Sequence, residues 1–154
     1  MEFLILEVDD ARFGIPTLDV KEIVRAVSLG DAPPQFPNMV GILNYRGQVL
    51  GVLDSARMCG RSYRELSPNE HLIILQFKDR LFAMRVDQAI EIMTWTDVDG
   101  QTDKPETDGD LVDGTRNAIS HPRFGIVHLL DTNKLWSELH LKQDHQPTQE
   151  VEAS

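Results

Sequence analysis

Short apolar runs separated by turn residues recur along the chain, and each run is about as long as a β-strand. Such a pattern is typical of a small antiparallel barrel or sandwich. The runs predicted to be strands are Phe3–Val8, Arg12–Ile15, Val49–Leu53, Leu72–Phe77, Leu81–Val86 and Phe124–Leu130. Polar corners at Asp9-Asp10 and Lys78-Asp79 are expected to join the first two strands of each half.

Two further runs, Val20–Arg25 and Ala89–Met93, are short enough to be either a strand or a single helical turn, and we favour strands. Helices are predicted at Ser55–Cys59 and Thr132–Leu139, because each follows an aspartate that can accept hydrogen bonds from free backbone N–H groups. The predicted fold class is therefore mainly β, with short helices.

The chain also carries an internal repeat. Phe3–Val24 aligns without a gap on Leu72–Met93. Identical residues pair at Ile5/Ile74, Leu6/Leu75, Asp10/Asp79, Phe13/Phe82, Glu22/Glu91 and Ile23/Ile92. A second match pairs Val52–Asp54 with Leu129–Asp131, which indicates that both halves share one plan.

The repeat predicts the domain organisation. One domain is expected over residues 1–141, built from two pseudo-repeat lobes with approximate halves 1–70 and 71–141, both of which contribute strands. The second half carries additional residues, which we place in the acidic segment Asp97–Asp113 as a solvated loop. The polar tail 142–154 is expected to be disordered.

Composition excludes several classes of protein. The 154 residues include 25 acidic and 15 basic side chains, for a net charge of -10, so a phosphate-binding track for nucleic acid is not expected. No apolar stretch approaches the roughly 20 residues that span a bilayer, so direct membrane insertion is not expected. A single cysteine and an opening segment without a secretion signal favour the reducing cytoplasm.

The sequence offers little catalytic chemistry. The histidines lie outside any zinc-binding spacing, and the Asp97-x-Asp99 segment lacks the glycine and glutamate positions of a calcium loop, so no metal or other cofactor is predicted. Cys59 is interpreted as a small buried residue, and no serine lies in a nucleophile-elbow motif. We therefore predict no catalytic residues and no enzyme.

The most informative segment is Gly41–Asp54, where two apolar runs flank an Asn-x-Arg-Gly corner. Gly47 suits a backbone position with positive φ, and Asn44 can hydrogen-bond its own turn, which fixes the direction of Arg46. A guanidinium between apolar strands must reach solvent or meet a carboxylate. We predict an ion pair between Arg46 and Glu22, which should add little net stability unless it is buried and fully hydrogen-bonded.

Together with Phe13–Pro16 and Val20–Arg25, this corner resembles the signature of the CheW-like adaptor family. The resemblance extends from Phe3 to about Trp136 and is strongest over Phe13–Asp54. In the second half it continues at Arg85–Asp87, Glu91–Ile92, Val112–Gly114 and Leu129–Asp131.

The resemblance implies two intertwined five-stranded SH3-like barrels with a hydrophobic groove between them. It implies a non-enzymatic scaffold of two-component signal transduction, which docks the cytoplasmic tip of a methyl-accepting chemoreceptor and the regulatory domain of a histidine kinase. Carried over by position, the residues that lie in or support the partner-binding surfaces are Val20, Glu22, Gly41, Asn44, Arg46 and Gly47.

The chain departs from the family pattern after the corner. Where the family usually has Pro-Val-x-Asp-Leu-Arg, this sequence has Gly51-Val52-Leu53-Asp54-Ser55-Ala56. A divergent paralogue serving a non-flagellar chemosensory pathway fits this departure. Two different functions are also compatible with the sequence. One is a small-molecule sensor that uses the groove between the lobes with the acidic loop as a lid, and the second is a regulatory fragment of a larger kinase or fused adaptor.

Overall fold

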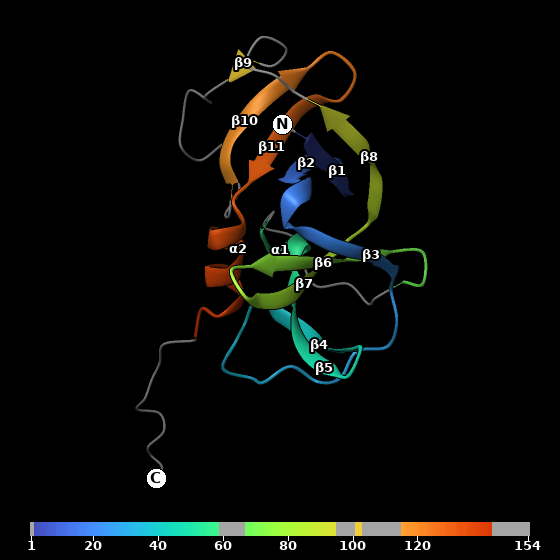
Figure 1. Ribbon diagram of the computed structural model, residues 1–154, viewed down its shortest axis with the longest axis vertical. Coiled ribbons are helices and arrows are strands. Elements are labelled where there is room, and N and C mark those ends of the chain that lie inside the picture. The colour runs from blue at the N-terminus through green and yellow to red at the C-terminus, as the bar shows by residue number, and fades with distance from the viewer. Residues whose placement is uncertain (1, 59–66, 95–100, 103–114, 143–154) are drawn as a thin grey trace.

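The computed structural model describes residues 2–58, 67–94, 101–102 and 115–142. The strands are β1 Glu2–Val8, β2 Ala11–Pro16, β3 Val20–Arg25, β4 Met39–Tyr45, β5 Gln48–Asp54, β6 His71–Phe77, β7 Arg80–Val86, β8 Gln88–Thr94, β9 Gln101–Thr102, β10 Thr115–His121 and β11 Gly125–Leu130. The helices are the 3-10 turn η1 Thr17–Asp19, α1 Ser55–Met58 and α2 Thr132–Leu139. Strands therefore dominate, as the apolar pattern predicts (Figure 1).

The strands form two sheets. Sheet A has the order β8-β1-β2-β11-β10-β9, and sheet B has the order β3-β6-β7-β5-β4. Each sheet has one parallel pair, β2 with β11 in sheet A and β5 with β7 in sheet B, and the other pairs are antiparallel. Figure 1 shows sheet A above sheet B, with α2 to one side.

The two sheets exchange strands. The repeat places β1-β2-β3 opposite β6-β7-β8 in sequence, but β3 pairs with β6 and β8 pairs with β1. The later hairpins cross over as well, because β5 pairs with β7 and β11 pairs with β2. Two intertwined barrels with five main strands each are therefore confirmed, and β9 adds a two-residue sixth strand to sheet A.

The described residues form three apolar clusters within this architecture. One lies inside sheet A, one lies inside sheet B, and the largest lies between the sheets, where α2 adds Leu135 and Leu139. β6 serves two clusters at once, since Leu72 and Ile74 pack inside sheet B while Ile73 packs between the sheets. The central run Leu72–Leu75 is apolar throughout because these residues are buried on both faces of the strand.

Local predictions agree well with the structure. The six predicted strands are present, and both ambiguous runs are strands, β3 and β8. The predicted corners are tight turns in which Asp9 has φ 53° and its repeat counterpart Lys78 has φ 56°. Helix α2 has the predicted bounds, and the Asp131 side chain accepts a hydrogen bond from the Asn133 N–H at 3.0 Å.

The apolar run before the Asn-x-Arg-Gly corner is β4, and two of the described strands, β9 and β10, were not predicted. β10 is polar, and β9 lies within Asp97–Asp113, which was predicted to be a loop throughout. That prediction is wrong for Gln101 and Thr102, because pairing at a sheet edge uses backbone groups and needs no apolar pattern. The other residues of that segment lie outside the described residues, as do Cys59 and residues 143–154 of the predicted tail.

Candidate functional site

Sheet B closes into a barrel where its two edge strands, β3 and β4, approach each other. At one end, Gly30 and Ile42 exchange backbone hydrogen bonds of 2.8 and 3.0 Å. At the other end, a side chain of β3 meets side chains from the β4–β5 turn. We call this second contact the B seam, formed by Glu22, Tyr45 and Arg46.

The β4–β5 turn aims Arg46 at the seam. Arg46 has φ 51° and Gly47 has φ 81°, a left-handed pair typical of two-residue hairpin turns. The Gly47 N–H donates to Asn44 Oδ1 at 3.2 Å, the local hydrogen bond that the sequence predicts. The turn therefore fixes where the guanidinium leaves the backbone.

Glu22 accepts two hydrogen bonds on one oxygen. Arg46 Nη2 lies 2.9 Å from Glu22 Oε1, and the Tyr45 hydroxyl donates to the same oxygen at 2.5 Å. The Arg46 guanidinium carbon also lies 5.2 Å from the centre of the Tyr45 ring. The Arg46 side chain is 72 % exposed and that of Glu22 is 36 % exposed, whereas Tyr45 is buried in the sheet B cluster.

These contacts shift the ionisation of all three groups. The Tyr45 hydrogen bond and then the Arg46 ion pair hold the pKa of Glu22 below its ordinary value. The Glu22 carboxylate in turn raises the pKa of both Tyr45 and Arg46. At neutral pH the seam therefore contains an ionised carboxylate, a neutral phenol and a guanidinium.

The remaining predicted site residues, Val20 and Gly41, lie outside the contact between Glu22, Tyr45 and Arg46. Val20 is half-buried against the cluster between the sheets. Gly41 lies at the far end of β4, roughly 16 Å along the strand from Arg46 at ~3.3 Å per residue. A Cβ on Gly41 would lie 2.8 Å from Leu29 Cβ and 2.9 Å from the Gly30 carbonyl oxygen, so Gly41 allows this backbone to approach.

Sequence reasoning missed the counterpart of the seam in sheet A. Arg123 Nη2 lies 2.5 Å from Glu91 Oε1, and the Arg123 guanidinium carbon lies 5.0 Å from the centre of the Phe124 ring. We call this contact the A seam. The signal was present, because Glu91 aligns with Glu22 in the repeat, but the arginine comes from a turn that the alignment did not include.

The departure from the family pattern lies mostly inside the protein. Ala56, at the place of the family arginine, is 4 % exposed. Ser55 is buried as well, and its hydroxyl donates to the Arg85 carbonyl oxygen. A Cβ on Gly51 would lie 2.8 Å from Met39 Cε, so this methionine occupies space that a proline would need. These changes alter packing and leave the B seam untouched.

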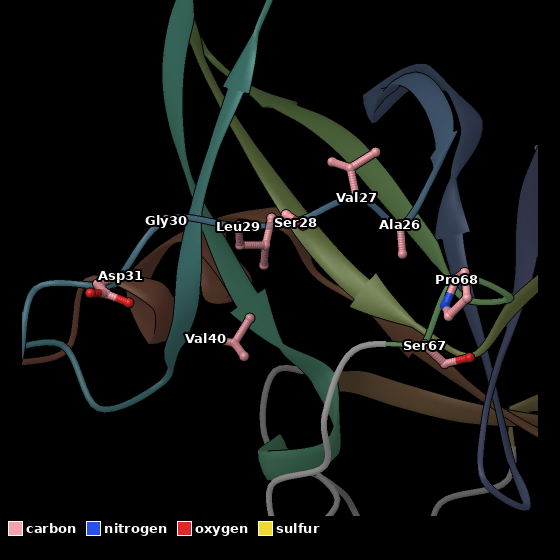
Figure 2. Close-up of a pocket in the computed structure, with 9 residues that line it drawn as sticks. All are labelled: Ala26, Val27, Ser28, Leu29, Gly30, Asp31, Val40, Ser67 and Pro68. Carbon is pink, nitrogen blue, oxygen red and sulfur yellow. The ribbon is translucent and has the colours of Figure 1, made fainter.

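Two of the cavities among the described residues bear on a sensor. One of about 660 Å³ is lined by residues 26–31 of the β3–β4 connection together with Val40, Ser67 and Pro68 (Figure 2). A smaller cavity of about 300 Å³ is lined by residues of both sheets, including Pro16 and Phe77, and by Asp19 of η1 and Thr132 of α2. The Thr132 hydroxyl already donates to Asp19 there, at 2.7 Å.

Exposed apolar side chains lie next to the B seam in sequence. Ile23 follows Glu22 and is 42 % exposed, and Val49 near the turn is 66 % exposed.

Within the described ranges, no three His, Cys, Asp or Glu side chains come together in a way that could hold a metal ion. In those same ranges no helix has the length and apolarity needed to cross a bilayer.

Comparisons with known proteins agree on one family. The CheW-like domain model matches residues 2–140. A Rhizobium etli protein named "Probable chemotaxis protein CheW" is 28% identical over 138 residues, covering 89% of this chain and 88% of that protein. The chemotaxis protein CheW of Rhizobium meliloti is 31% identical over 101 residues, covering 65% and 64%. Protein FrzA of Myxococcus xanthus is 33% identical over 73 residues, covering 47% and 46%.

A solved structure supports the fold. The scaffolding protein TtCheW from Thermoanaerobacter tengcongensis superimposes with a TM-score of 0.75 at 20% identity. The superposition covers 92% of this chain and 90% of that protein. The arrangement of intertwined barrels is therefore shared at low sequence identity.

Proposed function

The chain belongs to the CheW-like family, and on that premise we propose that it is a non-enzymatic scaffold that couples chemoreceptors to a histidine kinase in two-component signal transduction. The proposed partners are the cytoplasmic tip of a methyl-accepting chemoreceptor and the regulatory domain of the kinase. Both would place the protein in the cytoplasm.

The observation that carries this proposal is the composition of the B seam. A turn with fixed geometry presents an exposed arginine, and Ile23 and Val49 expose apolar surface close to it in sequence. Apolar contacts around an arginine are a common composition for the centre of a protein interface. We assign Glu22 and Arg46 to the docking surface itself.

The remaining assigned residues support that surface. Asn44 and Gly47 shape the turn, Val20 anchors β3 to the cluster between the sheets, and Gly41 keeps β4 close to the β3–β4 connection. A change at any of these four positions would act on docking through the position of Arg46 or Glu22.

A scaffold of this kind needs no chemistry of its own. Two surfaces of ordinary interface size, roughly 800 Å² per partner, are enough to hold kinase and receptor together. The receptor can then bias the kinase through the free energy that couples the two binding sites.

A pull-down from a lysate of the source organism at moderate salt tests the proposal. Recovery of a histidine kinase and a chemoreceptor, followed by direct binding of the purified kinase regulatory domain, is the expected result. Absence of both proteins together with a tightly held small molecule would overturn it and favour a sensor.

A further inference from the structure

Arg46 is the exposed charged side chain of the β4–β5 hairpin, because the other charged residue of these two strands, Asp54, is buried at 1 % exposure. Residues 39–53 include a single charged side chain, Arg46, although the whole chain has 25 acidic and 15 basic residues. Arg46 is also the exposed member of its ion pair. A lone exposed cation on a largely apolar hairpin is complementary to a carboxylate on an apolar partner surface.

Arg46 keeps donors for such a carboxylate. A guanidinium carries five N–H donors, and the ion pair with Glu22 runs through Nη2. Arginine can therefore hold two carboxylates on different edges of the same planar group. The 72 % exposure of the side chain leaves room for a partner to approach.

Tyr45 keeps Glu22 satisfied when Arg46 moves. Its hydroxyl donates to the oxygen that Arg46 contacts, and its ring is fixed in the sheet B cluster. Glu22 therefore keeps one side-chain donor of fixed position when Arg46 turns away from it. The A seam differs here, because Phe124 has no hydroxyl to offer to Glu91.

We propose that Arg46 binds a carboxylate of the docking partner, and that Tyr45 is a positioning residue that holds Glu22 in the seam while Arg46 turns outward. The proposal rests on the proposed function, since it names the chemistry of the partner at the same surface. It assigns the partner an aspartate or glutamate flanked by apolar side chains.

The positioning role is tested without any partner by NMR titration of the Glu22 carboxyl group. In Arg46→Ala the pKa of Glu22 is expected to stay below its ordinary value of 4.5, because the Tyr45 hydrogen bond remains. In Tyr45→Phe it is expected to rise further than in Arg46→Ala. A Glu22 pKa that does not respond to Tyr45→Phe would overturn the role of Tyr45.

The carboxylate preference is tested with two capped peptides, tetraglutamate and tetraglutamine. We expect the glutamate peptide to shift the Arg46 Nε–H resonance clearly more than the glutamine peptide does, and more than it shifts the Arg123 Nε–H resonance. Equal shifts with both peptides, or at both arginines, would overturn the preference.

Binding to the purified kinase regulatory domain completes the test. Arg46→Gln is expected to weaken binding roughly ten-fold and to reduce its salt dependence, and Tyr45→Phe to weaken it roughly three-fold. Unchanged affinity in Arg46→Gln would overturn the proposal. If the wild-type protein binds neither the kinase domain nor the receptor tip, the proposed function fails, whereas the two NMR experiments still decide the inference.

Discussion

The two barrels close with the same pair of residue types in different surroundings. In the B seam, Arg46 comes from a two-residue turn, and the buried Tyr45 shares its carboxylate. In the A seam, Arg123 comes from a longer turn between β10 and β11 and lies over the half-buried Phe124. Both arginines are exposed, so neither pair is placed to contribute much stability.

Comparing the two seams separates the features that both barrels share where they close from the features that occur at the B seam alone. An arginine, a glutamate and a neighbouring aromatic ring occur at both seams. The phenol hydroxyl and a hairpin whose exposed charge is a single arginine occur at the B seam, whereas the hairpin of the A seam also carries Arg116, His121 and His128. We therefore expect mutations at the two seams to have similar effects on folding and different effects on docking.

The largest expected effect of a mutation is a loss of stability, at the buried ion pair between Arg85 of sheet B and Glu70. Arg85 lies 2.7 Å from Glu70 through Nε and 3.3 Å through Nη2, and the two side chains are 3 % and 9 % exposed. The repeat places Pro16 of sheet A opposite Arg85, so this arginine has no counterpart there. Arg85→Met strands a buried carboxylate and should lower the free energy of unfolding by ~3–5 kcal/mol, measured by urea denaturation.

A double variant separates the charge from the packing. Arg85→Met combined with Glu70→Leu removes both charges and should recover much of the lost stability. Arg123→Ala is the matched surface change and should stay within about 0.5 kcal/mol of the wild type. A single Arg85→Met variant as stable as the wild type would contradict the prediction.

The next largest effect is on partner binding, where mutations at the two seams should differ. Arg46→Ala should fold normally and lose roughly ten-fold or more in affinity for the kinase domain or the receptor tip, because it removes the central cation of the docking surface. Arg123→Ala is the control, and its affinity should stay within about two-fold. Calorimetry with each partner makes the comparison, and equal losses for both variants would mean that the seams share the docking role.

A smaller effect comes from the glycines of the two turns. Gly47 and Gly125 have φ 81° and 72°, and a Cβ at either would meet nothing within 4 Å. Alanine at each should therefore cost only backbone strain, about 1 kcal/mol, in thermal unfolding. Only Gly47→Ala should also weaken partner binding, because it disturbs the direction of Arg46. Unequal stability losses would show that one turn has further constraints.

The smallest effect is a pH dependence confined to sheet A. His128 lines a cavity with Asp10 and Arg12, and burial lowers its pKa below the ordinary 6.5. The unfolded chain therefore binds the proton more readily than the folded protein does. Proton uptake by His128 in the unfolded chain lowers the stability of the folded protein. This loss of stability is absent well above pH 6.5 and grows as the pH falls through 6.5 towards the pKa of His128 in the folded protein.

His128→Asn removes this dependence. The melting temperature of the wild type should fall more steeply than that of the variant from about pH 7 to pH 5, whereas both should change alike above pH 7. Gly51 occupies the counterpart position in sheet B, so hydrogen exchange in mild acid should rise first around β11. If the melting temperatures of the two proteins fell equally steeply with pH, the pH dependence could not be assigned to His128.

Much of the candidate site was predictable from sequence. The Asn44 and Gly47 turn, the exposed Arg46 and its carboxylate partner Glu22 follow from residue types at a hairpin corner. Tyr45 was missed because an aromatic residue two positions after Leu43, on the same face of a predicted strand, is ordinarily interpreted as core. Its ring does belong to the core, and only the direction of the hydroxyl reveals the second donor to Glu22.

The sequence by itself determined most of the local elements of this protein, with β9 and β10 as the exceptions among the described strands. Alternating apolar positions, polar corners and a capping aspartate specify strands, turns and helix α2 through interactions within a few residues. The tertiary structure alone decided the partners: β3 pairs with β6, β8 pairs with β1, and Arg85 meets Glu70 inside the fold. Any two apolar strands can form backbone hydrogen bonds, so the choice between them rests on how the whole chain buries its three apolar clusters at once.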